Sequence, residues 1–258
     1  MSKLSVIIPS WKDPLLHKTI DDLLTNAVGD IEIIPVLDGY WPEKTIKSDE
    51  RVRVLHLGKN RGMRGAINAG VLASTGDFIM RSDEHCMFAK GFDKILTDDC
   101  QPNWITTARR YFLDPIKWER MSDPPVDCEK LVIQGGFKFA GQRWESRARK
   151  LKNELIIESM AMQGSMWVMP RKWWDKVIGE LQTDGYGPLY QDSHEIVFKT
   201  WQKGGKLMVN KKTWFAHKHR RFSRTHNYGT AEASPGWTYA LAVWRDYYET
   251  EIKPKWKV

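Results

Sequence analysis

The stretch FIMRSDEHCMF (residues 78–88) runs from a mainly apolar segment into three titratable side chains, Asp83, Glu84 and His85. The apolar segment has the length of a buried β-strand, and the titratable residues stand where that strand should end. Asp83 and His85 are two positions apart, so on an extended strand end they point the same way and can reach one ion. A carboxylate with an imidazole suits a divalent metal such as Mn²⁺. The stretch therefore predicts either a metal site or an exposed charged turn.

The residues around this stretch alternate between strand-like and helix-like segments. Strands are expected over residues 4–10, 30–39, 51–58 and 77–85, and helices over 15–27 and 64–74. Such alternation predicts an α/β fold, namely a Rossmann-like, mostly parallel sheet sandwiched by helices, with right-handed crossovers. Ligands of these sheets bind at the carboxyl ends of the strands. Those ends are expected to carry Pro9, Ser10, Trp11, Asp38, Gly39, Asp83, Glu84 and His85.

The second half of the chain is less regular, but its segments fit the same sheet. We expect a loop-rich stretch over 114–130, a hairpin around Gly135 and Gly136, a strand and then a helix near Pro170, a helix over 191–205, a strand over 206–221 and a C-terminal helix. No linker and no internal repeat separates the two halves. The chain is therefore predicted to form a single compact domain.

Composition places the chain among ordinary globular proteins. Its 258 residues can bury a sizeable core, and 41% of them are hydrophobic. The start lacks the apolar stretch of a signal peptide, and no window of about 18 apolar residues predicts a transmembrane helix. Cys86, Cys100 and Cys128 lack metal-binding spacing, so a reducing, cytoplasmic setting is expected. The net charge of +8 either attracts phosphate-bearing partners or is mild basicity without a partner.

A second cluster follows the expected strand at residues 206–221. WFAHKHRRFSR (residues 214–224) holds His217 and His219, with Arg220, Arg221 and Arg224 directly after them. A third metal ligand beside arginines is what a metal-bound diphosphate needs, because both the ion and the guanidinium groups neutralise it. The alternative is a basic, solvated loop. Two such clusters, each at a strand end, favour the functional interpretation.

With these motifs in place, the first hundred residues resemble the nucleotide-sugar half of a family 2 glycosyltransferase with the glycosyltransferase A fold. LSVIIPSWKD (4–13) is similar to that family's first strand, VLDGY (36–40) to its VDDGS strand end, and NRGMRGAINAGVLASTGDFIMRSDEH (60–85) to its long block ending in D-x-D. The second half resembles the polypeptide N-acetylgalactosaminyltransferases. DEHCM (83–87) corresponds to their DSHCE, DSHEIVFKTW (192–201) to their E-N-x-E…F-R-x-W helix, and AHKHR (216–220) to their GHVFR.

The resemblance covers about residues 3–220 and implies a role for each matching residue. Residues 1–100 would form the half that binds the nucleotide sugar, and residues 101–258 the half that binds the acceptor, with a C-terminal lid and helix. A UDP-sugar would be the donor, with Mn²⁺ or Mg²⁺ as the cofactor. The nucleotide would contact Pro9, Trp11, Asp38, Gly62, Arg64 and Arg220, with Pro9 and Trp11 lining the uracil pocket and Arg220 at the diphosphate. The metal ligands would be Asp83, His85 and His217.

Asp192 and Glu195 would be the catalytic residues beside the transferred sugar. The family's inverting members carry an E-D pair that supplies a base, and here that pair is either Gln191-Asp192 or Asp192-Ser193. In the first case Asp192 deprotonates the acceptor hydroxyl. In the second, Ser193 stands at the base position, and the enzyme would resemble the retaining N-acetylgalactosaminyltransferases, which the longer match favours. Leu37 also departs from the family, because it replaces the first acid of the DD pair.

The sequence gives fewer signals for the acceptor than for the donor. Gly164 and Trp167 are expected around the sugar on the acceptor side, and Arg143 and Arg147 in a segment that interleaves cations with aromatic rings. Such a segment suits nucleic acid, including DNA with a hydroxymethylated base, which the enzyme would have to extrude. A glycan, glycolipid or protein acceptor is the alternative, as is a binding module without catalysis. A nucleotidyltransferase is disfavoured because PSWKDP (9–14) is no Gly-rich loop. Residues 218–236 would form either a lid or an ordinary loop.

Overall fold

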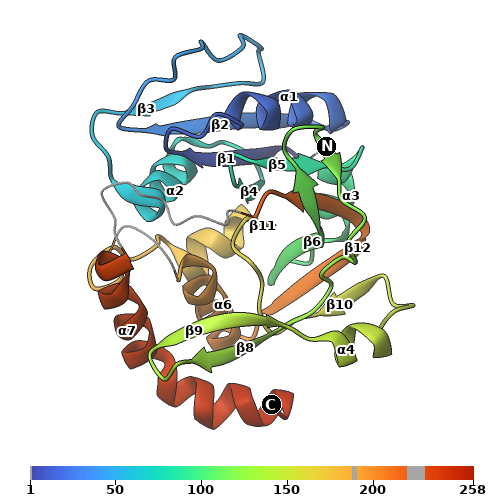
Figure 1. The fold of residues 1–258 in the computed structure, drawn as a ribbon, viewed down its shortest axis with the longest axis vertical. Helices are drawn as coiled ribbons and strands as arrows, with labels where there is room; N and C mark the ends of the chain where they lie inside the picture. Colours follow the sequence, from blue (N-terminus) through green and yellow to red (C-terminus); the bar gives the residue numbers. More distant parts are fainter. Residues whose placement is uncertain (1, 188–190, 220–229) are drawn as a thin grey trace.

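The computed structural model describes residues 2–187, 191–219 and 230–258, and Figure 1 shows a layered α/β molecule. Its main sheet has ten strands, eight of them in the order β10-β12-β6-β11-β4-β1-β2-β3. These eight are β1 (Leu4–Ser10), β2 (Ile31–Asp38), β3 (Leu55–Leu57), β4 (Phe78–Ser82), β6 (Trp104–Asp114), β10 (Ile156–Glu158), β11 (Met166–Pro170) and β12 (Lys206–His217). The short strands β5 (Cys86–Phe88) and β7 (Glu119–Arg120) pair with β12 and β6, and β8 (Glu129–Gln134) and β9 (Lys138–Arg143) form a separate hairpin.

Most strands of the main sheet point the same way. β1 is parallel to β2 and β4, β2 to β3, and β12 to β6. β11 lies between β4 and β6 and is antiparallel to both, so β6 and β12 run in the direction of β4. The carboxyl ends of β1, β2, β4 and β12 therefore meet at one edge, although they come from both halves of the chain. This confirms the predicted single, mostly parallel sheet.

Helices cover both faces of the sheet because side chains of the inner strands alternate between two hydrophobic clusters. From β1, Val6 and Ile8 pack with α1 (Leu16–Asn26) and α3 (Phe92–Asp99), whereas Ile7 packs on the opposite face. That opposite face is covered by α2 (Gly62–Ala73), α6 (Asp192–Gln202) and α7 (Thr230–Tyr247). The remaining helices are α4 (Glu145–Lys150), α5 (Arg171–Trp173), α8 (Lys253–Trp256) and the π-helical turns η1 (Trp174–Ile178) and η2 (Tyr248–Ile252).

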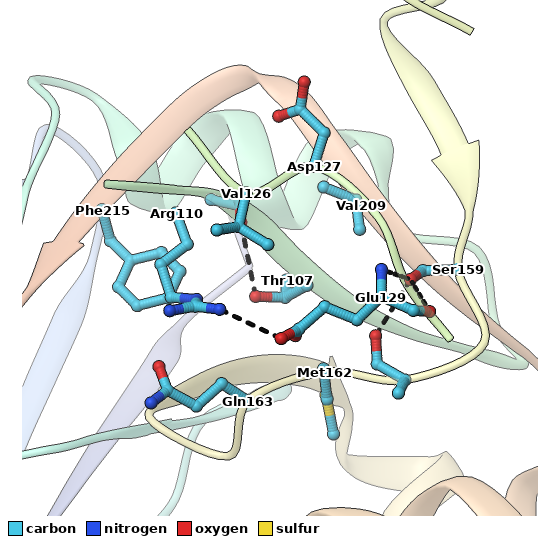
Figure 2. Close-up of a pocket in the computed structure, with 12 residues that line it drawn as sticks. Thr107, Arg110, Val126, Asp127, Glu129, Ser159, Met162, Gln163, Val209 and Phe215 are labelled. Atoms are coloured by element: carbon cyan, nitrogen blue, oxygen red, sulfur yellow. Dashed lines mark hydrogen bonds and ion pairs between the residues drawn. The ribbon is translucent and has the colours of Figure 1, made fainter. Parts of the chain in front are cut away.

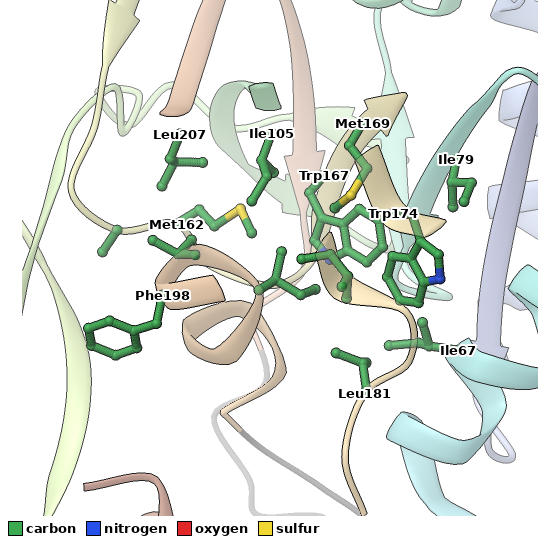
Figure 3. Close-up of a cluster of buried hydrophobic side chains, with 14 of the residues drawn as sticks. Ile67, Ile79, Ile105, Met162, Trp167, Met169, Trp174, Leu181, Phe198 and Leu207 are labelled. Carbon is green, nitrogen blue, oxygen red and sulfur yellow. The ribbon is translucent and has the colours of Figure 1, made fainter. Parts of the chain in front are cut away.

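The predicted place of Trp167 on the acceptor side is wrong. Trp167 was expected beside the acceptor, but its side chain is 0% exposed and stacks on Trp174 with ring centroids 5.8 Å apart. Figure 3 shows both rings among Ile79, Met169 and other apolar side chains beneath the sheet. On β11, Trp167 is paired with Arg81 of β4 in the middle of the sheet. Burial of such a large apolar surface stabilises the fold, and it leaves no part of the ring for a ligand.

Element boundaries differ from expectation at three places. The strand expected over 51–58 shrinks to Leu55–Leu57, because Val52 forms only an isolated bridge with Ile33. The strand expected over 77–85 ends at Ser82, and Asp83–His85 form the turn before β5. β6 lies in residues 104–114, for which the apolar pattern predicted no element, since Arg109 and Arg110 interrupt it. Among the described residues, no helix is long and apolar enough to cross a membrane.

Candidate metal centre and active site

Three predicted metal ligands converge at the carboxyl edge of the sheet. Nε2 of His217 lies 3.1 Å from Oδ2 of Asp83 and 3.1 Å from Nε2 of His85, and the last two atoms are 3.8 Å apart. Ligands about 2.1 Å from one ion and at right angles to each other are roughly 3.0 Å apart, and wider angles give longer separations. The three atoms therefore have the spacing of ligands around a single divalent ion.

Strand pairing brings these ligands together. Asp83 and His85 stand on the tight turn between β4 and β5, and β5 pairs antiparallel with β12. In that register His217 lies opposite Cys86, one residue beyond His85. Since His85 and His217 are 132 residues apart, only the sheet places their rings side by side, with centroids separated by 4.8 Å.

Further carboxylates and a cation hold the ligands in place. Oδ2 of Asp13, in the loop after β1, lies 3.1 Å from Nδ1 of His85. When Nδ1 of His85 donates to that carboxylate, the lone pair of Nε2 faces the proposed ion, as in many carboxylate–histidine–metal arrangements. Arg81 donates from Nη2 to Oδ1 of Asp83 at 2.6 Å, which leaves Oδ2 for the ion. Sequence reasoning missed Asp13 and Arg81, because neither forms a motif with the ligands.

The protonation states also suit a metal. Burial alone would raise the pKa of Asp83, but Arg81 and the two imidazoles beside it hold that pKa well below its usual range. Burial lowers the pKa of His217 to about 3, and the charge of Asp83 only partly opposes this effect. At neutral pH the carboxylate is therefore ionised and this imidazole is neutral. Both are the forms that bind metal ions.

Beside this centre, the loop after β1 borders a wide hollow. The hollow has a volume of ≈ 1030 Å³ including open solvent, and Asp13, Tyr40 and Trp41 are among its lining residues. Trp11 lies next to it, edge-on to Tyr40 at 5.9 Å, and its backbone N–H donates to Glu84 at 2.9 Å. Asp13 belongs both to this wall and to the His85 contact, so its carboxylate stands between the hollow and the proposed metal centre.

The other residues predicted at the nucleotide lie close to this edge, and their roles there remain predictions. Pro9 is buried in β1 opposite Val36. The two carboxylate oxygens of Asp38 accept the backbone N–H groups of Arg61 at 2.6 Å and Gly62 at 2.8 Å, which anchors the start of α2. Burial raises the pKa of Asp38, and these two hydrogen bonds oppose the rise. Arg220 lies outside the described residues, as does most of the expected lid.

Arg64 and Glu195 form an ion pair deep between α2 and α6. The side chains are 0% and 1% exposed, and Glu195 also pairs with Lys199 at 2.8 Å. Arg64 donates to the carbonyl of Gln182 at 2.7 Å and lies 4.2 Å from the ring of Tyr186. Burial lowers the pKa of Arg64, and the charge of Asp192 acts against that shift. The pair thus ties the helix of the first half to that of the second.

Asp192 stands at the start of α6 and faces Gly164. It is 5% exposed, and its Oδ2 has no hydrogen-bond partner among the described residues. A Cβ on Gly164 would lie 3.2 Å from this oxygen and 3.3 Å from Cβ of Ser193. Gly164 therefore lies directly against the predicted catalytic carboxylate, where a side chain at this position would be crowded.

A second polar cluster, centred on the buried Arg110, adjoins the metal ligands through His219. Nη1 of Arg110, on β6, lies 2.7 Å from Nε2 of His219, and its Nη2 donates to Glu129 at 3.1 Å. Figure 2 shows Arg110 and Glu129 across a narrow hollow that is also lined by Gln163. Because a guanidinium only donates, Nε2 of His219 must accept. No motif in the sequence indicated Arg110 or Glu129.

The two arginines predicted on the acceptor side have different surroundings. Arg143 is exposed at the end of β9, with its guanidinium 5.1 Å from the ring of Phe112. Arg147 lies against the rings of Trp144 and Trp256, at 5.5 and 4.9 Å, and donates to the carbonyl of Glu158 at 3.1 Å. Arg147 thus clamps α4 to the C-terminal α8, whereas Arg143 remains open to solvent.

This combination of a mostly parallel sheet with a carboxylate and two histidines at its carboxyl edge defines a protein with the glycosyltransferase A fold. Residues 5–178 match the model of Glycosyl transferase family 2, so the chain belongs to that family. The crystal structure of GalNAc-T7 with UDP, GalNAc and Mn²⁺ has a TM-score of 0.74, at 18% identity, over 98% of this chain and 50% of that one. That likeness confirms the predicted fold.

Two curated relatives are glycosyltransferases by name. The "Uncharacterized glycosyltransferase EpsJ" of Bacillus subtilis is 32% identical over 166 residues, which are 57% of this chain and 48% of EpsJ. "Polypeptide N-acetylgalactosaminyltransferase 4" of Mus musculus is 25% identical over 213 residues, 80% of this chain and 36% of the relative. The chain thus spans about half the length of the first relative and about a third of the second.

Proposed function

We propose that this protein is a metal-dependent glycosyltransferase that moves a sugar from a UDP-sugar to an acceptor hydroxyl. The observation that carries this proposal is the convergence of Asp83, His85 and His217 within 3.8 Å at the edge where such sheets bind ligands. Mn²⁺, or Mg²⁺ in its place, would be held by these three residues and would neutralise the diphosphate as it leaves. The family membership and the likeness to an enzyme solved with UDP, GalNAc and Mn²⁺ support the same donor.

Other residues position the metal ligands and bind the donor. Asp13 orients His85, and Arg81 orients Asp83. The hollow beside Trp11 and Tyr40 is the place proposed for the uridine, because it adjoins the metal centre and has aromatic walls. The donor sugar would then lie between the ion and Asp192.

The stereochemical course follows from the role of Asp192. We propose the retaining course, because the match of residues 192–201 to the N-acetylgalactosaminyltransferases puts Ser193 where inverting members have their base. An inverting enzyme would use Asp192 as the base instead. The anomeric configuration of the product, read by NMR immediately after transfer, distinguishes the two courses.

Two acceptor classes have specific support. The exposed Arg143, together with Arg149 and Lys150 on α4, favours an anionic acceptor such as DNA carrying a hydroxymethylated base. The similarity to polypeptide N-acetylgalactosaminyltransferases favours a polypeptide hydroxyl. The protein acceptor is therefore the stronger candidate.

The decisive experiment measures UDP release from a panel of UDP-sugars with Mn²⁺. It is run without acceptor, with Ser/Thr-containing peptides and with hydroxymethylcytosine-containing DNA. Slow Mn²⁺-dependent hydrolysis that disappears in Asp83→Ala supports the donor half, and stimulation by one acceptor identifies its class. If no UDP-sugar is bound or cleaved in any arm, the proposal is wrong and a non-catalytic binding module takes its place.

A further inference from the structure

His219 is an exposed imidazole at the rim of the proposed metal centre. It stands two residues after His217, and the two rings meet edge to face with centroids 5.1 Å apart. Nε2 of His219 lies 2.7 Å from Nη1 of Arg110. A guanidinium has no lone pair to offer, so Nε2 accepts and the ring proton sits on Nδ1. Arg110 therefore holds His219 as a neutral imidazole whose remaining polar group is a hydrogen-bond donor.

Arg143 lies beside this imidazole and contacts the same aromatic ring. The ring centroid of Phe112 is 4.8 Å from that of His219 and 5.1 Å from the guanidinium of Arg143. Arg143 is exposed, and within the described part of the chain no carboxylate forms an ion pair with it. Phe112 thus carries a second hydrogen-bond donor, and this one is charged.

One carboxylate serves two guanidinium groups at this place. In the β8–β9 hairpin Glu129 lies directly opposite Arg143, but its Oε1 accepts from Nη2 of Arg110 at 3.1 Å instead (Figure 2). Burial lowers the pKa of Arg110; the charge of Glu129 opposes this shift, and that of Arg143 adds to it. The neighbouring Asp127 is held by Arg109 at 2.7 and 2.8 Å. The cluster therefore keeps a surplus of positive charge.

The exposed surface formed by Phe112, His219 and Arg143 is called the Phe112 shelf below. Its two side-chain polar groups only donate hydrogen bonds, and one of them is a cation, so a carboxylate, which only accepts, is the complementary group. We propose that the Phe112 shelf binds an acidic side chain of a peptide acceptor, close to the Ser or Thr that receives the sugar. This inference rests on the proposed function, because it takes the acceptor to be a polypeptide.

The size of the shelf favours a peptide over a nucleic acid. Nucleic acid carries a phosphate at every nucleotide and is bound by a series of cations, whereas the shelf offers one cation and one neutral donor. Because His219 adjoins His217, the shelf borders the place proposed for sugar transfer. An extended peptide advances about 3.3 Å per residue. The acidic residue is therefore expected within about two positions of the accepting hydroxyl.

The test measures the binding of fluorescein-labelled peptides to the full chain with Mn²⁺ and UDP. Each peptide has one Thr among alanines, and one Glu or Gln within two positions of it. We expect one Glu peptide to bind about tenfold more tightly than its Gln counterpart, because charge-assisted hydrogen bonds are the stronger ones. In Arg143→Gln this preference should fall to about twofold or less. Arg245→Gln, which removes an exposed guanidinium of α7, is the matched control and should keep the full preference.

Two further positions test the fixed tautomer. His219→Phe keeps a ring against Phe112 but removes the N–H, so part of the preference should be lost. Arg110 acts as a positioning residue, through His219. In ¹⁵N NMR spectra Nδ1 of His219 should carry the proton in the wild type, and Arg110→Met should lose both this signature and part of the preference. Arg110→Lys, which keeps a donor, should recover both in part.

Equal affinity of the wild type for every Glu peptide and its Gln counterpart would overturn the inference, as would full preference in Arg143→Gln. If hydroxymethylcytosine-containing DNA binds more tightly than any peptide, and Arg143→Gln abolishes this binding, nucleic acid is the occupant and the peptide is excluded. Charge-dependent peptide binding without cleavage of any UDP-sugar would support the shelf and reject the proposed function alone.

Discussion

The Nε2 atoms of His85 and His217 lie 3.1 Å apart, although 132 residues separate them in the chain. Two imidazole nitrogens at this distance, with the carboxylate of Asp83 beside both, have the spacing of ligands around the proposed divalent ion. A proton can be shared by only one pair, whereas a divalent ion satisfies all three ligand atoms at once. The relationship accounts for the acidic turn that follows the apolar strand at residues 78–82.

Removing one of these ligands should remove metal binding. In His217→Ala the ion would keep Asp83 and His85 only, so Mn²⁺ titrated into the variant should give no calorimetric binding, and Mn²⁺ should no longer raise its Tm. His56→Ala, which changes a histidine stacked on Trp41 instead, should behave like the wild type. Undiminished Mn²⁺ binding by His217→Ala would rule out this centre.

The carboxylate of Asp13 should tune the affinity of the site without forming part of it. Asp13→Asn keeps the oxygen that accepts the N–H of Leu15 at 2.8 Å, so the fold is preserved, but it removes the charge beside Nδ1 of His85. Such changes typically cost about 10–100-fold in metal affinity. Calorimetry with Mn²⁺ measures this directly. An unchanged dissociation constant would mean that Asp13 does not orient the ligand.

The buried pair of Arg64 and Glu195 should show strong coupling. Glu195→Gln removes the negative charge that faces Arg64, and breaking such a buried pair costs about 3–5 kcal/mol of the free energy of unfolding. The double variant Arg64→Met/Glu195→Gln should cost less than the sum of the single variants, as measured by urea unfolding. Asp98→Asn breaks the exposed pair with Lys94 and should cost under about 1 kcal/mol. Additive single costs would contradict the coupling.

Glu32 should make stability depend on pH in the acid range. Burial alone would raise the pKa of Glu32. Hydrogen bonds from Ser5 and Thr75, together with the charge of Lys3, instead lower this pKa from 4.5 to about 2. A carboxyl with a lowered pKa in the folded state adds stability above about pH 4.5, and this contribution is lost as the pH falls towards about 2. Glu32→Gln should therefore be less stable than the wild type at neutral pH, and the difference should shrink between those two values.

Urea unfolding at several pH values tests this, with the exposed Glu154→Gln as the control. A constant difference across the acid range would show that the ionisation of Glu32 does not contribute.

Gly70 should be required for the packing of α2 on the sheet. A Cβ at this position would lie 2.4 Å from Cγ2 of Ile7 and 3.0 Å from Cγ2 of Val36. Gly70→Ala forces the helix or these side chains to move, which typically costs about 1–3 kcal/mol of the free energy of unfolding. Gly58→Ala serves as the control, because a Cβ at that position meets nothing within 4 Å. Equal stability of both variants, measured by thermal unfolding, would show that the contact relaxes without cost.

Local patterns were sufficient for most of the first half. The helices over 15–27 and 64–74 correspond to α1 and α2, and the strand over 30–39 corresponds to β2, because hydrophobic periodicity reflects which face of an element is buried. The pattern missed β6, where Arg109 and Arg110 interrupt the apolar run. Both arginines are paired, with Asp127 and Glu129, and neither carboxylate is a neighbour in sequence.

The residues of the candidate site also differ in how well the sequence could place them. Asp83 and His85 could be selected from their spacing, since two residues of one extended segment share a direction. Trp167 could not be placed correctly, because the same aromatic residue suits a ligand wall or a core. Only its packing against Trp174 distinguishes these two cases.

By itself, the sequence determined the alternation of elements, the acidic turn after an apolar strand and the chemistry that such ligands can perform. These properties depend on residue types and on spacings within one segment. The tertiary structure alone decided that Asp13 contacts His85 and that Glu195 neutralises Arg64. These relationships arise where the loop after β1 meets the turn after β4 and where α6 faces α2. They join residues too far apart in the chain for any local pattern to connect.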